Sequence, residues 1–141
     1  MAFHLRPWET DAPTQLLSAA LRHHAGRFAE RTSVTVQVVV EGREFALSPA
    51  VTYGLTRIAQ EALTNAARHA ACSNIIISLR YASDGACACA IVDDGAGFDP
   101  AIPRTGVGLQ TMRERAGQLG GVLQLRSGPG QGTSILVELP G

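Results

Sequence analysis

Midway along the chain stands the sequence Glu61-Ala62-Leu63-Thr64-Asn65-Ala66-Ala67-Arg68-His69-Ala70. It continues an apolar pattern at three- and four-residue spacing that begins behind Ser48-Pro49, a typical helix start in which a capping hydroxyl precedes a proline. This spacing predicts the longest helix of the chain, from Pro49 to about Ala70. A second, polar face of that helix carries Arg57, Glu61, Asn65 and either Arg68 or His69.

The polar face allows two interpretations. The simpler is a solvated surface with a Glu61–Arg57 ion pair. Asn65 argues against it, because asparagine is a poor residue for a helix interior and this one stands among alanines. A carboxylate and a carboxamide one turn apart can together hold a hydrated divalent cation, since magnesium prefers oxygen ligands and keeps several waters. The pattern therefore leaves open a metal–phosphate site at Asn65, with Glu61 nearby.

A second candidate feature is a strand that runs into an acidic, glycine-spaced turn, Ile91-Val92-Asp93-Asp94-Gly95-Ala96-Gly97-Phe98. One interpretation is purely structural: the segment is a surface loop in which the aspartates favour the turn and the glycines adopt φ > 0. The other interpretation is a binding site, in which Asp93 at the strand end would accept a hydrogen bond from a ligand amino group. Gly95 and Gly97 would let the backbone approach that ligand. A dinucleotide-binding fingerprint is disfavoured, because Pro100 stands where the third glycine is needed.

The third feature is Gly106-Val107-Gly108-Leu109, which leads directly into a predicted helix. Free N–H groups at a helix N-terminus, with the helix dipole behind them, form an anion site. Alone, such a sequence usually marks a flexible connection. Together with the acidic turn and the polar helix face, it supplies the last of three pieces that could bind base, metal and phosphate.

The remaining periodicity predicts the other elements of the fold. Helices are expected over 13–31, 49–70 and 109–119, and strands over 34–40, 45–47, 75–81, 86–92, 122–126 and 133–139. The first two strands are expected to form a hairpin, and the small residues of 86–92 to be buried on both faces of the sheet. The order helix, two strands, helix, two strands, helix, two strands predicts an α/β fold, a two-layer sandwich with a mixed sheet and helices packed on one face.

Length and composition restrict the possible functions. The 141 residues suit one domain, and all 12 basic residues are arginine, balanced by 12 acidic residues. The absence of lysine excludes an amine nucleophile, a Schiff base and a P-loop lysine. Zero net charge offers no attraction to nucleic acid or an anionic membrane, and no apolar run approaches the ~20 residues of a membrane span. The three cysteines have neither zinc-site spacing nor an even count, so a cytoplasmic domain in a reducing compartment is expected.

In combination, these motifs resemble the ATP-binding catalytic domain of sensor histidine kinases, most closely the nitrate-sensor and DesK-like branch. The likeness extends over nearly the whole chain. It adds four further segments, Met112-Arg113-Glu114-Arg115, Leu119-Gly120-Gly121, Ser127-Gly128-Pro129-Gly130-Gln131-Gly132-Thr133 and Leu139-Pro140. The resemblance implies the Bergerat fold of the gyrase, Hsp90, histidine kinase and MutL superfamily, which holds ATP between helices and a lid.

The resemblance also implies a role for individual residues of the long helix. Asn65 would ligate Mg²⁺, and Glu61 would be the catalytic acidic residue beside it that polarises water or supports the metal. Arg68 and His69 would approach the phosphates.

Further implied roles fall on the two glycine-rich segments and the last strand. Asp93 would accept from the adenine amino group, with Thr133 behind it, and Gly95 and Gly97 would shape the base pocket. Gly106 and Gly108 would hinge the lid and donate to phosphates, and Leu109 would be a further ATP-binding residue.

The function implied is that of a protein histidine kinase domain, which delivers the γ-phosphoryl of ATP to a histidine on a separate helical dimerisation domain for relay to a response regulator. Residues 1–141 are expected to be this ATPase domain alone, without phosphoacceptor or sensor domains, and hence a cytoplasmic monomer without direct membrane contact, although the parent kinase can be membrane-anchored. Two alternatives use the same fold. One is a stand-alone anti-sigma-type serine kinase, and the other is a non-catalytic module in which ATP-driven lid closure changes partner binding.

Overall fold

The computed structural model describes residues 16–69, 72–97, 99 and 109–141. The elements, in chain order, are α1 (Leu17–Thr32), β1 (Thr35–Glu41), α2 (Pro49–His69), β2 (Asn74–Tyr81), β3 (Cys87–Asp93), α3 (Leu109–Gln118), β4 (Val122–Ser127) and β5 (Thr133–Leu139). They lie close to the predicted ranges, apart from a strand over 45–47. Of the helix predicted over 13–31, residues 13–15 lie outside the described residues. No helix among the described residues combines the length and the apolar character that a bilayer crossing requires.

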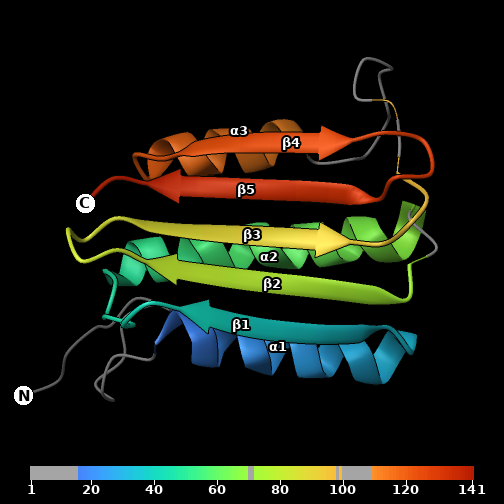
Figure 1. Ribbon diagram of the computed structural model, residues 1–141, viewed down its shortest axis with the longest axis horizontal. Coiled ribbons are helices and arrows are strands. Elements are labelled where there is room, and N and C mark those ends of the chain that lie inside the picture. The colour runs from blue at the N-terminus through green and yellow to red at the C-terminus, as the bar shows by residue number, and fades with distance from the viewer. Residues whose placement is uncertain (1–15, 70–71, 98, 100–108) are drawn as a thin grey trace, which may run out of the picture.

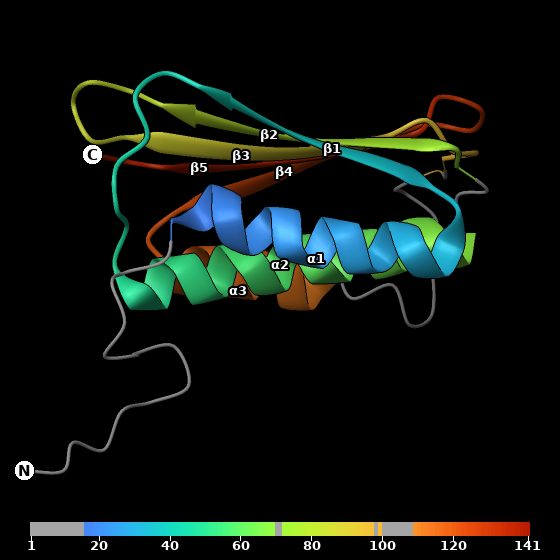
Figure 2. The same cartoon turned by 90° about the horizontal axis from the view of Figure 1, so that it is seen from below.

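The strands form one mixed sheet in the order β1-β2-β3-β5-β4. The β1–β2 pair is parallel and the other three pairs are antiparallel. A parallel pair needs a long crossover, which α2 provides. Figure 2 shows the sheet as one layer and the three helices as the other. The predicted α/β two-layer sandwich, with a mixed sheet and helices on one face, is therefore confirmed.

The predicted hairpin between 34–40 and 45–47 is wrong. Residues 43–48 form no strand, and the chain leaves the sheet there for the helical layer. The Glu44 carboxylate accepts hydrogen bonds from Ser18 N (3.1 Å), Ser18 Oγ (2.7 Å) and Tyr81 Oη (3.0 Å). Phe45 packs edge-on against the Tyr81 ring, with centroids 4.9 Å apart. The alternation at Phe45 and Leu47 thus reflects packing at the end of the core rather than strand pairing.

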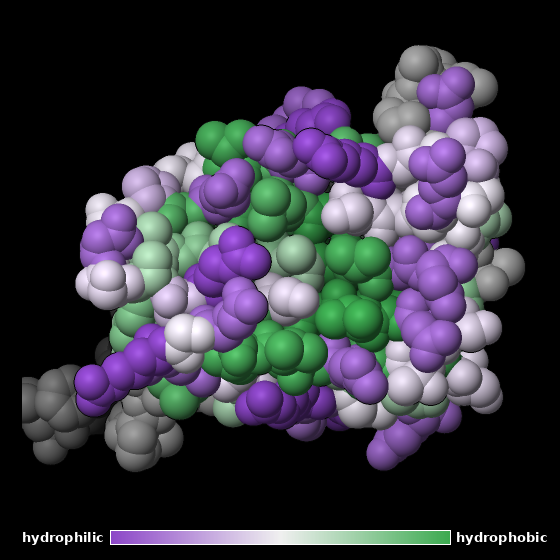
Figure 3. Space-filling view, in the orientation of Figure 1, coloured by the Kyte–Doolittle hydropathy of each residue, from purple (hydrophilic) through white to green (hydrophobic). Residues whose placement is uncertain are grey.

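Burial of β3 on both faces, the second expectation for the sheet, is also wrong. Its residues alternate between the helical layer and an outer face on which Val92 is 42% exposed. Figure 3 looks onto that outer face and shows apolar side chains between polar ones. Since all three helices lie on the other side, only Cys87, Cys89 and Ile91 are buried against them. The small residues Ala88 and Ala90 occupy the uncovered face, so their size does not indicate a covering helix.

Helix α2 lies between α1 and α3 and presents its apolar face to the sheet. Ser48 Oγ accepts from Val51 N (3.2 Å), which confirms the predicted helix start. Leu55, Ile58 and Leu63 are almost fully buried, and each such side chain contributes about 1.5–3 kcal/mol to folding. This packing fixes the rotation of α2 and so decides where its polar face points.

Candidate nucleotide-binding site

Most of the described candidate residues gather at one edge of the sheet. The carboxyl ends of α2 and β3, the end of β4 and the start of β5 all lie there (Figure 1). The strand register places Asp93 opposite Thr133, and Thr133 opposite Ser127. The sheet thus brings together residues that are far apart in sequence. The sequence motifs suggested that these residues form one site, but not how they meet.

Asp93 is held in a fixed orientation at this edge. Its Oδ1 accepts the Gly95 N–H at 2.9 Å, and the side chain is half-buried. Burial raises the pKa of Asp93, while backbone hydrogen bonds from Gly95 and Thr133 oppose that rise. A half-buried, oriented carboxylate suits the recognition of a ligand donor such as an amino group.

Asp94 has a different role from its neighbour. Its carboxylate accepts from Ser73 N (2.8 Å), Asn74 N (3.0 Å) and Asn74 Nδ2 (3.0 Å). Hydrogen bonds from Asn74 and Ser73 lower the pKa of Asp94 to about 2. Asp94 therefore ties the start of β2 to the end of β3. Side chains of adjacent residues in a strand point to opposite sides. This alternation was the sequence signal that Asp93 and Asp94 have different partners.

The glycine-rich turns after β3 and between β4 and β5 pack backbone against backbone. Gly97 has φ +67°, and a Cβ there would collide with the carbonyl oxygens of Gly128 and Gly132. Gly132 has φ +70°, and its Cβ would collide with the carbonyl oxygen of Asp93. The motifs alone gave no individual role to Gly128 or Gly132. The sequence signal for a close approach of this turn to another backbone segment was the spacing of the glycines in Gly128-Pro129-Gly130-Gln131-Gly132.

Thr133 is positioned by its neighbour across the strand pair. The hydroxyls of Ser127 and Thr133 are 3.1 Å apart, and Ser127 Oγ also donates to the Gly132 carbonyl at 2.9 Å. These contacts hold the Thr133 hydroxyl beside the end of β3. Thr133 and Asp93 thus form one polar group at the sheet edge.

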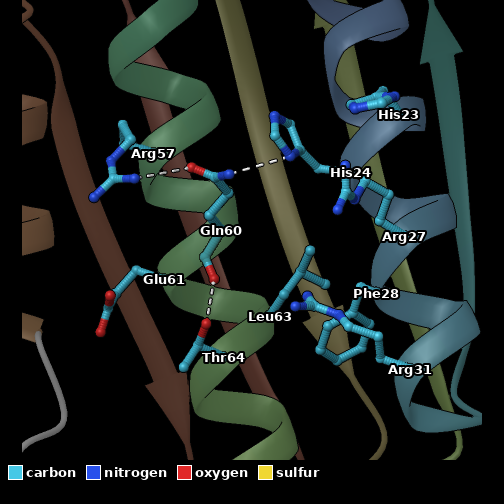
Figure 4. Close-up of a pocket in the computed structure, with 10 residues that line it drawn as sticks. All are labelled: His23, His24, Arg27, Phe28, Arg31, Arg57, Gln60, Glu61, Leu63 and Thr64. Carbon is cyan, nitrogen blue, oxygen red and sulfur yellow. Dashed lines mark hydrogen bonds between the residues drawn. The ribbon is translucent and has the colours of Figure 1, made fainter.

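The polar face of α2 is partly buried toward its carboxyl end. Glu61 and Asn65 are half-buried, whereas Arg57 and Arg68 are exposed. Arg57 Nη1 donates to Gln60 Oε1 (3.4 Å) instead of pairing with Glu61, so the simple Glu61–Arg57 surface pair is not formed. Figure 4 shows Glu61 on the side of α2 that faces away from α1. Two oxygen-bearing side chains therefore lie one turn apart on a helix that ends near Asp93.

The predicted phosphate-binding residues are only partly described. Gly106 and Gly108 lie outside the described residues, as does the His69 side chain. Leu109 is the first residue of α3, and it is half-buried against the core.

Comparison with known proteins decides the family. Residues 50–141 match the family model described as histidine kinase-, DNA gyrase B- and HSP90-like ATPase. The chain belongs to this ATPase family. The matched range holds every candidate residue, so the resemblance drawn from the motifs is confirmed.

Relatives of this ATPase domain are sensor histidine kinases. An uncharacterised sensor-like histidine kinase of Chloroflexus aurantiacus is 34% identical over 99% of the chain, which covers 24% of that protein. The nitrate/nitrite sensor protein NarQ of Escherichia coli is 34% identical over 86% of the chain and 22% of its own length. The ATPase domain thus spans about a quarter of these relatives. It is an ATP-binding domain of the sensor histidine kinase type.

Solved structures agree on the fold. The ATP-binding domain of PrrB from Mycobacterium tuberculosis superposes with a TM-score of 0.72 at 23% identity, covering 90% of this chain and 95% of that one. The histidine kinase domain of a blue-light activated kinase from Erythrobacter litoralis gives 0.69, also at 23% identity, over 90% of this chain and 62% of that one. The fold of the ATPase domain is therefore that of histidine kinase ATP-binding domains.

Proposed function

We propose that this ATPase domain binds ATP with Mg²⁺ at the sheet edge and transfers the γ-phosphoryl group to a histidine of a separate helical domain, for relay to a response regulator. The observation that carries the proposal is the placement of an oriented carboxylate, Asp93, at the same edge as the carboxyl end of α2, which bears Glu61 and Asn65. Residues 1–141 would serve as the catalytic domain of that kinase.

Recognition of adenine is assigned to the end of β3. The Asp93 carboxylate would accept the hydrogen of the adenine amino group, with the Thr133 hydroxyl behind it. The Gly95 N–H already directs one carboxylate oxygen, so binding costs little side-chain ordering. Gly95 would let the backbone approach a planar base, and Gly97 would shape the pocket by holding the turn after β3 against the carbonyls of Gly128 and Gly132.

The metal is assigned to the polar face of α2. An amide oxygen and a carboxylate one turn apart fit the oxygen preference of Mg²⁺, and the half-burial of Asn65 and Glu61 limits competition from solvent. When bound, Mg²⁺ supplies charge neutralisation for the phosphate oxygens. Asn65 would hold the metal, and Glu61 would support it or polarise the attacking group.

The phosphates are assigned to the start of α3 and the end of α2. Gly106, Gly108 and Leu109 would donate N–H groups where the positive end of the α3 dipole lies. Arg68 and His69 would add positive charge in place of the lysine that this chain lacks. In transfer, the bond between the γ-phosphorus and the bridging oxygen breaks, a bond to the imidazole nitrogen forms, and ADP leaves. Such catalysis consists mostly of positioning and charge neutralisation.

A labelling experiment tests the function. The chain is mixed with γ-labelled ATP, Mg²⁺ and a purified histidine-bearing helical dimer, and the labelled residue is identified by its acid stability. We expect acid-labile phosphohistidine with the parent chain, and loss of label with Glu61→Gln but not with the exposed Glu30→Gln. Acid-stable phosphoserine would instead indicate the anti-sigma-type serine kinase, and nucleotide binding without any transfer would indicate the non-catalytic module.

A further inference from the structure

The outer face of the sheet is apolar at its centre, and none of the described helices covers it. All three helices lie on the other side of the sheet, as Figure 2 shows. On the outer face Val39, Ile76 and Val92 are 46%, 41% and 42% exposed, and Figure 3 shows apolar side chains gathered there. None of these three residues has a role in the proposed nucleotide contacts. A contiguous apolar patch of this kind marks an interaction surface.

The strand register fixes the position of each side chain on this face. Its middle row crosses the five strands and consists of Val39, Ser78, Ala90, Leu136 and Gln124. The small side chains of Ser78 and Ala90 leave a hollow of about 310 Å³, which Leu136 borders on the β5 side. The face therefore has a depression with a ridge next to it.

Large and small side chains alternate across β3. In the middle row, the small Ser78 lies on the β2 side of β3 and the large Leu136 lies on the β5 side. In the next row the order is reversed, with Ile76 on the β2 side and Ser134 on the β5 side. A second copy rotated by half a turn about an axis along β3 brings its β5 opposite β2 of the first. Leu136 then lies over the hollow at Ser78, and Ile76 lies over Ser134, twice by symmetry.

The same rotation also pairs opposite charges. Arg80 of β2 and Glu138 of β5 flank Ala88 of β3 in the row at the other end of the face. In the rotated pair, Arg80 of each copy lies opposite Glu138 of the other copy. Arg80 already donates to Glu41 of its own chain at 2.8 Å, and the five N–H donors of a guanidinium can serve both carboxylates. The face thus attracts a second copy of itself.

The face is large enough for a weak dimer. Five strands about 4.8 Å apart, each of about seven residues at about 3.3 Å, give a face of roughly 550 Å². Two such faces bury about 1,100 Å² in total, just above the roughly 1,000 Å² that a specific interface needs. An interface at this lower bound is expected to have a Kd between about 1 μM and 1 mM.

We propose that the outer sheet face binds the same face of a second copy of this chain, about a twofold axis along β3. The two sheets then pack face to face about 10 Å apart, as the sheets of a β-sandwich do. The chain would thus associate, in contrast to the monomer expected from the motifs. Because rotation about this axis preserves strand direction, the Asp93 ends of both sheets lie at the same end of the pair. The inference goes beyond the proposed function and does not depend on it.

Sedimentation equilibrium of the full chain, without nucleotide, tests the association. We expect the parent to change from monomer to dimer between about 1 μM and 1 mM. Ala90→Arg places a guanidinium on the twofold axis, next to its symmetry copy, and should raise Kd at least about tenfold. The control is Ala50→Arg, at an exposed residue of α2, which should change Kd less than about twofold. A parent that stays monomeric over this range, or equal effects of the two variants, would overturn the proposal.

Charge exchange tests the axis itself. Arg80→Glu and Glu138→Arg each place like charges opposite one another in the homodimer, so either variant alone should have a Kd at least about tenfold higher. In an equimolar mixture of the two variants, opposite charges face each other again at both positions. Heterodimers should therefore form with nearly the parental affinity, which a folding defect of either variant could not produce. Weak association of the mixture would overturn the proposed axis.

Other coverings of the face give different results. A persistent monomer in which Ala90→Arg lowers the free energy of unfolding would indicate that another part of the same chain covers the face, and a dimer insensitive to Ala90→Arg would place the contact elsewhere. Either result would overturn the proposal. The affinity of Ala90→Arg for ADP, measured by calorimetry, should equal that of the parent. Because the association is measured without nucleotide, failure of the dimer and failure of the proposed kinase function are distinguishable.

Discussion

Asp93, the last residue of β3, pairs across the sheet with Thr133, the first residue of β5. This pairing places the two proposed adenine contacts, 40 positions apart in sequence, at one point of the sheet edge. The carbonyl oxygen of Asp93 also lies where only a glycine fits at position 132. The proposed nucleotide site is therefore built by the sheet register and by close packing of two glycine-rich turns.

Asp93→Asn tests the adenine contact. Loss of one charge-assisted hydrogen bond should weaken ADP and ATP binding by on the order of 1.5 to 3 kcal/mol. Isothermal titration calorimetry with ADP gives the affinity directly. Asp94→Asn is the matched control, since Asp94 bonds to Ser73 and Asn74, and its nucleotide affinity should equal that of the parent. Equal affinities of the Asp93 variant and the parent for ADP would refute the contact.

Asp94 should instead govern acid stability. Its pKa is about 2 in the folded chain, below the ordinary 3.8, because the ionised form accepts hydrogen bonds. A lowered pKa means that this stabilisation is present above pH 3.8 and is lost as the pH falls toward 2. Urea unfolding across this pH window should therefore show a flatter pH dependence for Asp94→Asn than for the parent.

A suitable comparison is Asp84→Asn, which alters another turn aspartate, one that accepts from Ala86 N (2.9 Å). If Asp94→Asn and the parent lost stability in parallel between pH 4 and pH 2, the assigned role of Asp94 would be wrong.

Gly132→Ala tests the close approach of the two turns. The added Cβ meets the Asp93 carbonyl, and φ +70° disfavours any side chain, so a loss of about 1–3 kcal/mol in unfolding free energy is expected. Nucleotide affinity should fall as well, because Asp93 must shift. The control is Gly117→Ala in α3, where a Cβ meets no atom within 4 Å. It should stabilise by about 0.5–1 kcal/mol. Equal stability of the Gly132 variant and the parent in denaturant would contradict the packing described.

The sequence was informative where a single element determines the structure. The apolar spacing on α2, together with Ser48 and Pro49, was sufficient for its bounds and for the face that carries Glu61 and Asn65. The place of Asp93 at the end of a strand could be predicted for the same reason. Both features depend only on the local periodicity of one helix or one strand, which is the same in any fold that contains that helix or strand.

The wrong predictions concern segments whose structure depends on contacts with residues distant in sequence. Phe45 and Leu47 alternate like a strand, yet Glu44 binds Ser18 of α1 and Tyr81 of β2, which directs that segment into the helical layer. Ala88 and Ala90 are small without being covered, because the helices occupy the opposite face. The collision between Gly132 and Asp93 likewise depends on strand register, which the sequence does not reveal.

The most direct test of the nucleotide site is the effect of Mg²⁺ on ATP binding by the parent and by Asn65→Ala, measured by calorimetry with Mg²⁺ and with EDTA. Thr64→Ala, an exposed neighbour on α2, serves as the control. We expect Mg²⁺ to strengthen ATP binding by the parent and by Thr64→Ala, and Asn65→Ala to abolish the Mg²⁺-dependent binding. Unchanged affinity of Asn65→Ala for ATP in the presence of Mg²⁺ would contradict it.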